Sequence, residues 1–187
     1  MHPVTVTRSA EHERFASLYE RHAALVLAYA RRRIGAAEAE DVLAETFLVA
    51  WRRREEVPVD ALPWLYAVAG NVLRNRVRSE RRRTALSARL AAESARLEAE
   101  TARGATAPPA PLAADHLPAD ADAPDPRLRA ALDRLRPIDR EALLLTAWEG
   151  LSTERAARAA GCSRATFHVR LHRARKRLAQ ALESETR

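Results

Sequence analysis

The chain has 187 residues, 47% of them hydrophobic, which is enough for one ordinary domain or two small ones. Lys and Arg number 32 against 25 Asp and Glu, and the net charge of +7 favours a polyanionic partner, either nucleic acid or an anionic membrane surface. The single cysteine, Cys162, excludes an internal disulfide. No apolar run approaches the roughly 18 residues of a membrane span, and no signal peptide is visible. We therefore expect a cytoplasmic protein without a membrane-inserted segment.

Two helices are expected in the first part of the chain. Apolar residues recur at helical spacing from Phe15 to Tyr29, which predicts a first helix. A second helix is predicted from Asp41 to Trp51, with one apolar face formed by Leu43, Phe47, Ala50 and Trp51. Strand-type alternation of apolar and polar residues is not convincing anywhere, so the fold class is all-α.

A loop and a long helix follow. Pro58 and Pro63 bracket a loop in residues 55–62, and Pro63 is a favourable residue for the first turn of a helix. The helix is expected to run from about Pro63 to the arginine cluster at residues 81–83. Gly70 lies inside it at a cost in helix propensity of about 1 kcal/mol, which favours a close approach of another helix or a ligand there.

Residues 84–126 differ from their flanks in composition and charge. They carry 3 basic and 7 acidic side chains and six of the ten prolines. Residues 85–103 are Ala-rich and favour a helix, whereas residues 104–126 are expected to form a flexible Ala/Pro-rich linker. We therefore expect two small helical domains, over residues 10–83 and 127–187, joined by this segment.

The C-terminal domain is expected to form a helix-turn-helix. Four helices are predicted, over residues 127–135, 139–148, 152–160 and from 163 onward. Asp139, Ser152 and Ser163 have side chains that suit N-caps, and "GLST" and "GCS" mark the turns. In the last helix, one apolar stripe is formed by Phe167, Leu171, Ala174, Leu178 and Leu182. The remaining sides carry Arg, His and Lys, which could enter a DNA major groove, although a solvated basic face is the simpler alternative.

Two segments together resemble the extracytoplasmic-function (ECF) sigma factors of RNA polymerase. Region 4 of that family resembles "LDRLRPIDREALLLTAWEGLSTERAARAAGCSRATFHVRLHRARKRL". Region 2 resembles three stretches in order, "FASLYERHAALVLAYARRRIG", "AEDVLAETFLVAWRR" and "PWLYAVAGNVLRNRVRSERRR". The resemblance implies a non-enzymatic protein without cofactors that binds core RNA polymerase and directs it to promoter DNA. It also implies a possible anti-sigma factor as a partner, and domains that pack together or onto it and hide basic faces.

The resemblance also implies which residues make each contact. The −35 element would be read by Arg164, Thr166, His168, Val169, Arg170, His172, Arg173 and Lys176. His168 and Val169 replace residues usual in the family, so the base sequence that this helix would read at −35 is left undetermined. The −10 element would be bound by Asn71, Arg74, Asn75, Arg78, Arg81 and Arg82, with the loop 55–62 forming part of a pocket for an extruded base. Core polymerase would meet Asp41, Glu45, Leu48 and Arg52.

Three other functions remain open from the residues. The stretch "LRPIDREALLLTAWEGLST" also resembles the DNA-binding domain of response regulators, so a helix-turn-helix regulator that binds duplex DNA without polymerase is the alternative function. Cys162, His168 and His172 form C-x5-H-x3-H, a weak zinc pattern that lacks a fourth ligand. A phosphotransfer or hydrolytic enzyme is remote, because no phosphate-binding loop, metal cluster or nucleophile–base pair is visible.

Overall fold

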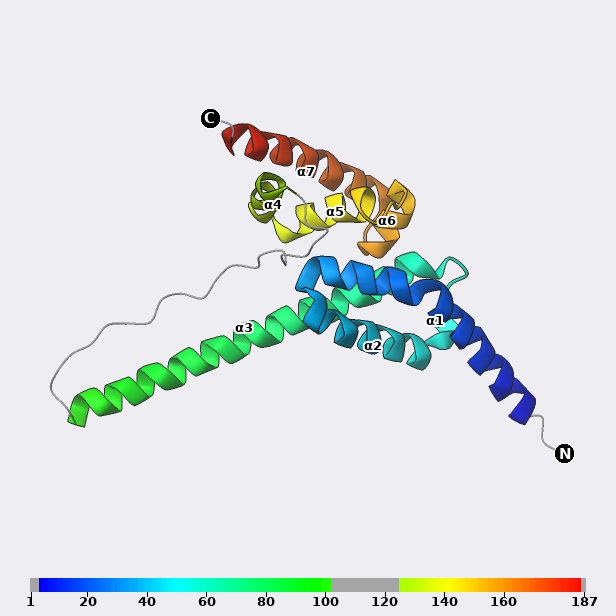
Figure 1. The fold of residues 1–187 in the computed structure, drawn as a ribbon, viewed down its shortest axis with the longest axis horizontal. Helices are drawn as coiled ribbons and strands as arrows, with labels where there is room; N and C mark the ends of the chain where they lie inside the picture. Colours follow the sequence, from blue (N-terminus) through cyan, green and yellow to red (C-terminus); the bar gives the residue numbers. More distant parts are fainter. Residues whose placement is uncertain (1–3, 102–124, 186–187) are drawn as a thin grey trace.

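The structure is a computed structural model that describes residues 4–101 and 125–185 (Figure 1). Every regular element within those residues is a helix. In chain order they are α1 (Val4–Ile34), α2 (Ala36–Arg52), the 3-10 turn η1 (Arg54–Glu56), α3 (Ala61–Thr101), α4 (Pro126–Asp133), α5 (Pro137–Ala147), α6 (Thr153–Ala159) and α7 (Arg164–Glu185). The all-α prediction is therefore confirmed.

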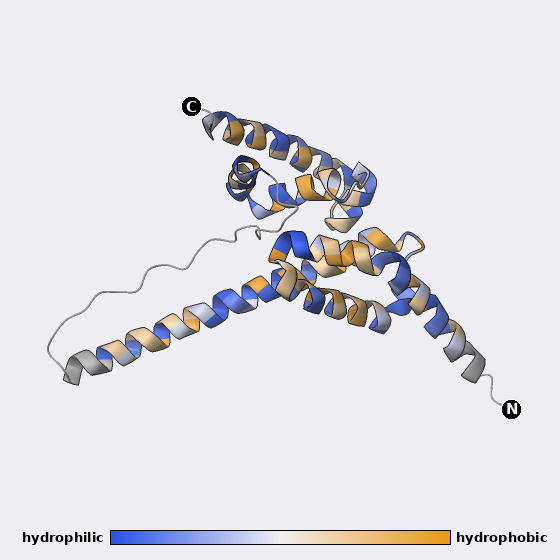
Figure 2. Ribbon diagram, in the orientation of Figure 1, coloured by the Kyte–Doolittle hydropathy of each residue, from blue (hydrophilic) through white to orange (hydrophobic). Residues whose placement is uncertain are grey.

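The first bundle consists of α1, α2 and the N-terminal half of α3, which pack against one another. Its centre contains the fully buried side chains of Val26, Val42 and Leu65. Figure 2 shows hydrophobic and hydrophilic segments alternating along these helices, as expected for amphipathic helices around one core. Phe47 lies on the buried face of α2 as predicted, and Trp51 is partly buried beside Phe15 with ring centroids 5.0 Å apart.

The long helix α3 begins slightly before the predicted start and joins the predicted helical segment after residue 83 without a break. It begins at Ala61, so Pro63 lies within the first turn, where a missing N–H leaves no hydrogen bond unmade. It then continues through residues 84–101 as one unbroken helix, which confirms the helical start of the inter-domain segment. This outer part projects away from both bundles in Figure 1, and its described side chains are nearly all exposed.

Gly70 marks a close approach between α3 and α1. A Cβ atom at this position would lie 3.1 Å from the hydroxyl oxygen of Tyr29, which is tighter than ordinary van der Waals contact. Tyr29 is almost completely buried and stacks on Tyr66 of α3, with ring centroids 4.7 Å apart. The glycine therefore leaves room for a tyrosine at the surface where the two bundles meet, and the predicted close approach is confirmed.

The second bundle consists of α4 to α7, and α6 and α7 form a helix-turn-helix. Ser152 Oγ accepts a hydrogen bond from the backbone N–H of Arg155, and Ser163 Oγ accepts one from Thr166, so both predicted caps are confirmed. Gly161 occupies the turn with a φ of 63°, a conformation that favours glycine. Phe167, Leu171 and Ala174 are buried, which confirms the predicted apolar stripe of α7.

The predicted capping role of Asp139 is wrong. Pro137 occupies the first turn of α5, so the N-cap is Arg136 and Asp139 lies inside the helix. The carboxylate of Asp139 is 2% exposed and pairs with Arg177 of α7 and Arg136. Asp139 therefore links α5 to α7 within the second bundle and does not cap α5.

The segment between the bundles lies largely outside the described residues. The flexible linker predicted for residues 104–126 is described only at Asp125 and Pro126, where Asp125 caps α4 by accepting a hydrogen bond from the backbone N–H of Arg127 at 2.9 Å. Among the described helices, none combines the length and apolar character that crossing a bilayer requires.

The burial of Phe167 generates a stability prediction. Replacing this fully buried ring by Ala should lower the free energy of unfolding by about 3–5 kcal/mol, through lost apolar contact and the cavity left behind. Urea denaturation followed by circular dichroism and by tryptophan fluorescence measures the loss. The matched control is Val169→Ala, two residues along the same helix and 47% exposed, which should change stability by no more than about 0.5 kcal/mol. Similar losses in both variants would contradict the burial pattern.

Candidate nucleic-acid interface

The exposed side of α7 carries the residues predicted to read the −35 element. Seven of the eight predicted residues have exposed side chains, and Arg170 is partly buried beside the apolar stripe. The exposed members are Arg164, Thr166, His168, Val169, His172, Arg173 and Lys176. Because the opposite side of the helix is buried against α5 and α6, the basic residues face solvent with a fixed orientation. An exposed basic helix face of this kind suits entry into a DNA major groove.

A second basic surface runs along α3. Its residues share one face about 120° wide at 100° per residue, and all six are exposed, namely Asn71, Arg74, Asn75, Arg78, Arg81 and Arg82. Arg74 donates a hydrogen bond to Asn71 Oδ1 at 2.5 Å, which orders the start of this stripe. Such a continuous stripe of guanidinium and amide groups suits the sugar–phosphate backbone of nucleic acid.

A hollow lies between α1 and the loop that follows η1. From the loop it is lined by Val57, Pro58 and Val59, and Val59 is fully exposed at the tip. Sequence reasoning predicted this loop but missed the other wall, which α1 supplies with Arg14, Phe15, Leu18, Arg21 and His22. Only helical phase could have indicated these residues, since they recur at three- and four-residue spacing on one side of α1.

The predicted polymerase surface lies on the outer side of α2. Asp41, Glu45, Leu48 and Arg52 are all exposed, and Leu48 is a large apolar side chain with 46% of its area accessible. Arg76 of α3 lies 3.3 Å from Asp41 Oδ2 and 3.5 Å from Glu45 Oε2, so the two carboxylates are held close together. The combination is a mixed apolar and charged surface at the rim of the first bundle.

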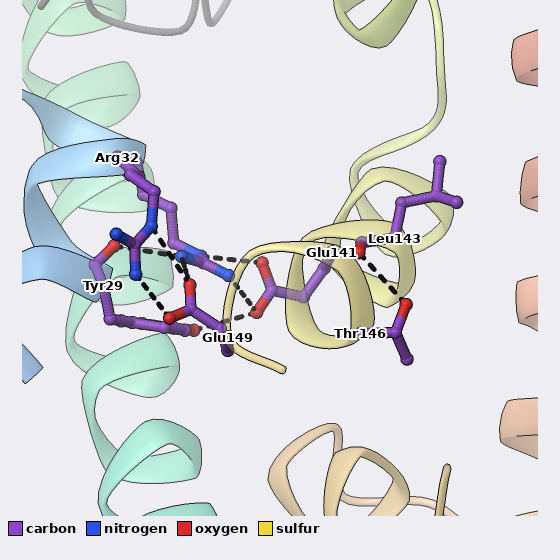
Figure 3. Close-up of polar contacts among 7 residues, drawn as sticks. Tyr29, Arg32, Glu141, Leu143, Thr146 and Glu149 are labelled. Carbon is purple, nitrogen blue, oxygen red and sulfur yellow. Dashed lines mark hydrogen bonds and ion pairs between the residues drawn. The ribbon is translucent and has the colours of Figure 1, made fainter. Parts of the chain in front are cut away.

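The two bundles meet through an ion cluster that the sequence did not reveal (Figure 3). Arg33 Nε lies 2.8 Å from Glu141 Oε2, and Arg33 Nη1 lies 2.9 Å from Glu149 Oε1. Arg32 Nη2 donates to Glu149 Oε2 at 2.5 Å, and Tyr29 Oη donates to Glu141 Oε1 at 2.9 Å. The side chain of Glu149 is 1% exposed and that of Arg33 is 9% exposed. These residues lie more than a hundred positions apart, and no local pattern signals their pairing.

Burial and charge in this cluster determine its protonation. Burial opposes the charge of Arg33, but Glu141, Tyr29 and Glu149 outweigh it and raise its pKa. Burial, together with the charge of Glu141, raises the pKa of Tyr29. Burial and the neighbouring Glu149 raise the pKa of Tyr66 to about 12. Both tyrosines are therefore protonated hydrogen-bond donors, and Arg33 is charged, across the physiological pH range.

A second ion cluster joins the bundles with the opposite polarity. Asp60, at the end of the loop 55–62, accepts hydrogen bonds from Arg155 Nε at 3.1 Å and Arg155 Nη2 at 2.8 Å, and from Arg158 Nη2 at 2.7 Å. Arg155 of α6 thus holds the carboxylate of Asp60 with two parallel hydrogen bonds. These hydrogen bonds lower the pKa of Asp60.

No part of the described chain gathers three or more His, Cys, Asp or Glu side chains in a geometry that could hold a metal ion. Cys162 is partly buried in the turn before α7, whereas His168 and His172 are exposed on the helix. The exposed basic surfaces on α7 and α3 are therefore the features whose function has to be explained.

Comparison with known proteins assigns the chain to a family. Sigma-70 region 2 matches residues 18–83, and Sigma-70 region 4 matches residues 126–178. The RNA polymerase sigma factor CarQ of Myxococcus xanthus is 32% identical over 182 residues, which cover 94% of this chain and 92% of CarQ. This chain is an RNA polymerase sigma factor. Like the proteins of that family, it binds core RNA polymerase and directs transcription initiation at promoters.

Two further relatives refine the assignment. The ECF RNA polymerase sigma factor SigL of Mycobacterium tuberculosis is 39% identical over 89 residues, which cover 46% of this chain and 50% of SigL. The sigma factor RpoE of Bartonella quintana, solved in complex with the anti-sigma factor NepR, has the same fold, with a TM-score of 0.57 at 24% identity over 91% of this chain and 98% of that one. The predicted ECF sigma factor is thus confirmed.

The packing of the two bundles corrects one expectation from the resemblance. The domains do pack together, but the contact leaves both basic faces exposed, because the seam is formed by α6, Glu141 and Glu149. The exposed basic residues of α7 and the stripe on α3 lie outside this contact. The closed arrangement of this sigma factor therefore constrains the distance between these two basic faces and does not cover them.

His22 gives the stability of the folded chain a pH dependence. Its Nδ1 atom is buried without a hydrogen-bond partner, and burial, Arg21 and Arg155 lower its pKa, opposed by Asp60. In the unfolded state His22 takes up its proton near pH 6.5, whereas in the folded state it does so only at a lower pH. The unfolded state therefore binds more protons than the folded state in this range, and the free energy of unfolding falls as the pH drops through 6.5 toward the lowered pKa. Between pH 7.5 and 5.5 the free energy of unfolding should decrease more steeply for the wild type than for His22→Gln, as measured by urea denaturation. Parallel decreases would contradict the prediction.

Proposed function

We propose that the two domains of this sigma factor divide promoter recognition between them. Residues 10–83 bind core polymerase and the −10 element, residues 127–187 bind the −35 element, and residues 84–126 join them. The observation that carries this proposal is the occurrence, in one chain, of matches to regions 2 and 4 that each place a basic face toward solvent. The protein acts by binding alone and works in the cytoplasm, where bacterial polymerase is found.

The −35 element is read by the exposed side of α7. The residues assigned to this contact are Arg164, Thr166, His168, Val169, Arg170, His172, Arg173 and Lys176. Arg170 is partly buried, so its guanidinium group has fewer accessible orientations than those of its exposed neighbours. A preoriented guanidinium group suits two parallel hydrogen bonds to a guanine, whereas the exposed basic residues suit phosphates.

The −10 element is bound along α3 after strand separation. Asn71, Arg74, Asn75, Arg78, Arg81 and Arg82 follow the backbone of the single strand. The hollow between α1 and the loop 55–62 accepts an extruded base, since Phe15 and Leu18 supply an apolar floor and Arg14, Arg21 and His22 supply polar groups. Asn75 carries no negative charge, which favours approach of a phosphate.

Core polymerase contacts the outer face of α2 through Asp41, Glu45, Leu48 and Arg52. Leu48 gives this surface an apolar centre, and the charged residues around it set the specificity. An anti-sigma factor is a further partner of this chain, an inference supported by the shared fold of RpoE in its complex with NepR.

Run-off transcription tests the function. Purified chain with bacterial core polymerase should initiate from promoters found by mapping transcription start sites after overexpression.

Asp41→Arg combined with Glu45→Arg should abolish co-purification of core polymerase by reversing two charges of the α2 surface. The control Glu20→Arg with Glu40→Arg makes the same charge change at exposed positions of the same domain and should retain binding. Equal binding by both double variants would remove α2 from the interface.

Arg170→Ala tests the −35 reading. It should weaken binding to the correct −35 sequence by about 1–3 kcal/mol if the side chain makes a bidentate base contact. The loss is measured by competition binding of the holoenzyme to matched and scrambled −35 duplexes. Arg175→Ala, an exposed change of the same type on α7, should weaken both duplexes equally. A loss of equal size on both duplexes for Arg170→Ala would show that it contacts phosphate alone.

A further inference from the structure

The basic stripe on α3 does not end at the boundary of the first bundle. Arg78 and Arg82 belong to this stripe, and the next arginines along the helix are Arg89 and Arg96. At about 100° per residue, Arg96 has the same phase around the helix as Arg78, and Arg82 and Arg89 lie within about 40° of it. Because seven residues complete nearly two full turns, these arginines follow one line along the helix.

The helix is continuous and open to solvent over this stretch. Helix α3 extends from Ala61 to Thr101 without a break, and every side chain from residue 85 to residue 96 is exposed. Figure 1 shows this outer part projecting away from both bundles. The outer arginines are therefore presented on a helical rod whose phase is fixed by the packing of its first turns in the bundle.

The other residues of this stretch leave the line accessible and basic. Ala85 and Ala92 lie between the arginines, within about 40° of Arg78, and their small side chains permit the close approach of another backbone. Glu93 is the one acidic residue among residues 84–96, and it lies at the edge of the line, about 60° from Arg78. Arg83 lies on another side of the helix, where it donates a hydrogen bond to Glu80 at 3.0 Å.

The line has the length and charge spacing to contact a DNA backbone. From Arg82 to Arg96 the helix advances about 21 Å, the length of roughly six base pairs of duplex. Duplex DNA carries one phosphate charge per about 1.7 Å of its axis, so arginines about 10 Å apart can meet phosphates in any base sequence. Each guanidinium group can donate two parallel hydrogen bonds to a phosphate.

The place of this segment in the chain indicates which DNA it meets. The stripe nearer the bundle is assigned to the −10 element, and the connection to the domain assigned to the −35 element leaves from the end of α3. The outer half of α3 thus lies between the two DNA-binding parts of the chain. The DNA between the two promoter elements, here called the spacer duplex, is the polyanion next to it.

We propose that the outer half of α3 is a further DNA contact of this sigma factor, in which Arg89 and Arg96 bind phosphates of the spacer duplex. The inference rests on the proposed role of α3 at the −10 element. Such a contact adds affinity without reading bases, and it fixes the direction of the helix along the DNA. A merely solvated helix surface would not require its arginines to continue the line that begins on the bundle.

Salt-dependent binding of the holoenzyme tests the contact. The long probe is a promoter fork with a single-stranded −10 element, the spacer duplex upstream of it and a scrambled −35 sequence. Arg89→Ala with Arg96→Ala should weaken binding about threefold to tenfold. The slope of log affinity against log salt should become shallower by about 1.8, because each lost phosphate contact removes about 0.9. Alanine favours the helix, so the circular dichroism spectrum should be unchanged.

A short probe and matched variants locate the contact. On a fork that ends at the upstream edge of the −10 element, the double variant should bind as tightly as the wild type. Arg89→Ala alone should reduce the slope on the long probe by about 0.9. Arg83→Ala removes an exposed arginine that is nearer the bundle but off the line, and it should leave the slope unchanged. Glu93→Gln removes the acid at the edge of the line and should strengthen binding to the long probe only.

Three results would overturn the inference. An unchanged slope for the double variant on the long probe would show that these arginines are merely solvated. An equal loss on both probes would place them at the −10 element. Weaker binding of the double variant to core polymerase without DNA, measured by fluorescence anisotropy, would make the outer half of α3 a polymerase contact. Failure of the wild-type holoenzyme to bind either fork would instead overturn the proposed function.

Discussion

The burial of Phe167, Leu171 and Ala174 determines how this protein presents its charge. These side chains hold α7 against α5 and α6, and because a helix is rigid about its axis, they decide which residues face solvent. The buried pair of Asp139 with Arg177 adds an electrostatic contact between α5 and α7. Loss of the apolar contact would let α7 rotate, and a rotated helix would expose apolar residues to solvent in place of arginine and histidine.

The same principle operates along α3, which serves two environments in succession. Its first turns supply Leu65 and Ala69 to the core of the first bundle, and its later turns carry the exposed basic stripe. The seam with the second domain lies against the first part of this helix, where Tyr66 stacks on Tyr29 and Asp60 precedes the first turn. One continuous helix therefore contributes to the core of the first bundle, to the seam between the domains and to an exposed basic surface.

Most of the local structure could be predicted from the sequence, whereas the contacts between domains could not. Phe167 and its partners recur at helical spacing, and Ser152 and Ser163 are typical caps, so these features follow from neighbouring residues. Asp139 also resembles a cap, but Pro137 moves the helix start by one turn and leaves the carboxylate for Arg177. The pairing of Arg33 with Glu141 joins residues 108 positions apart and leaves no trace in either local pattern.

The unbroken course of α3 to Thr101 bears on how far the protein can reach. From Arg82 to Thr101 the helix advances about 28 Å at about 1.5 Å per residue, so the covalent connection to the second domain starts well outside the first bundle. The 23 residues that follow, 102–124, have a contour length of about 80 Å at most. The covalent connection therefore does not by itself hold the two bundles close together.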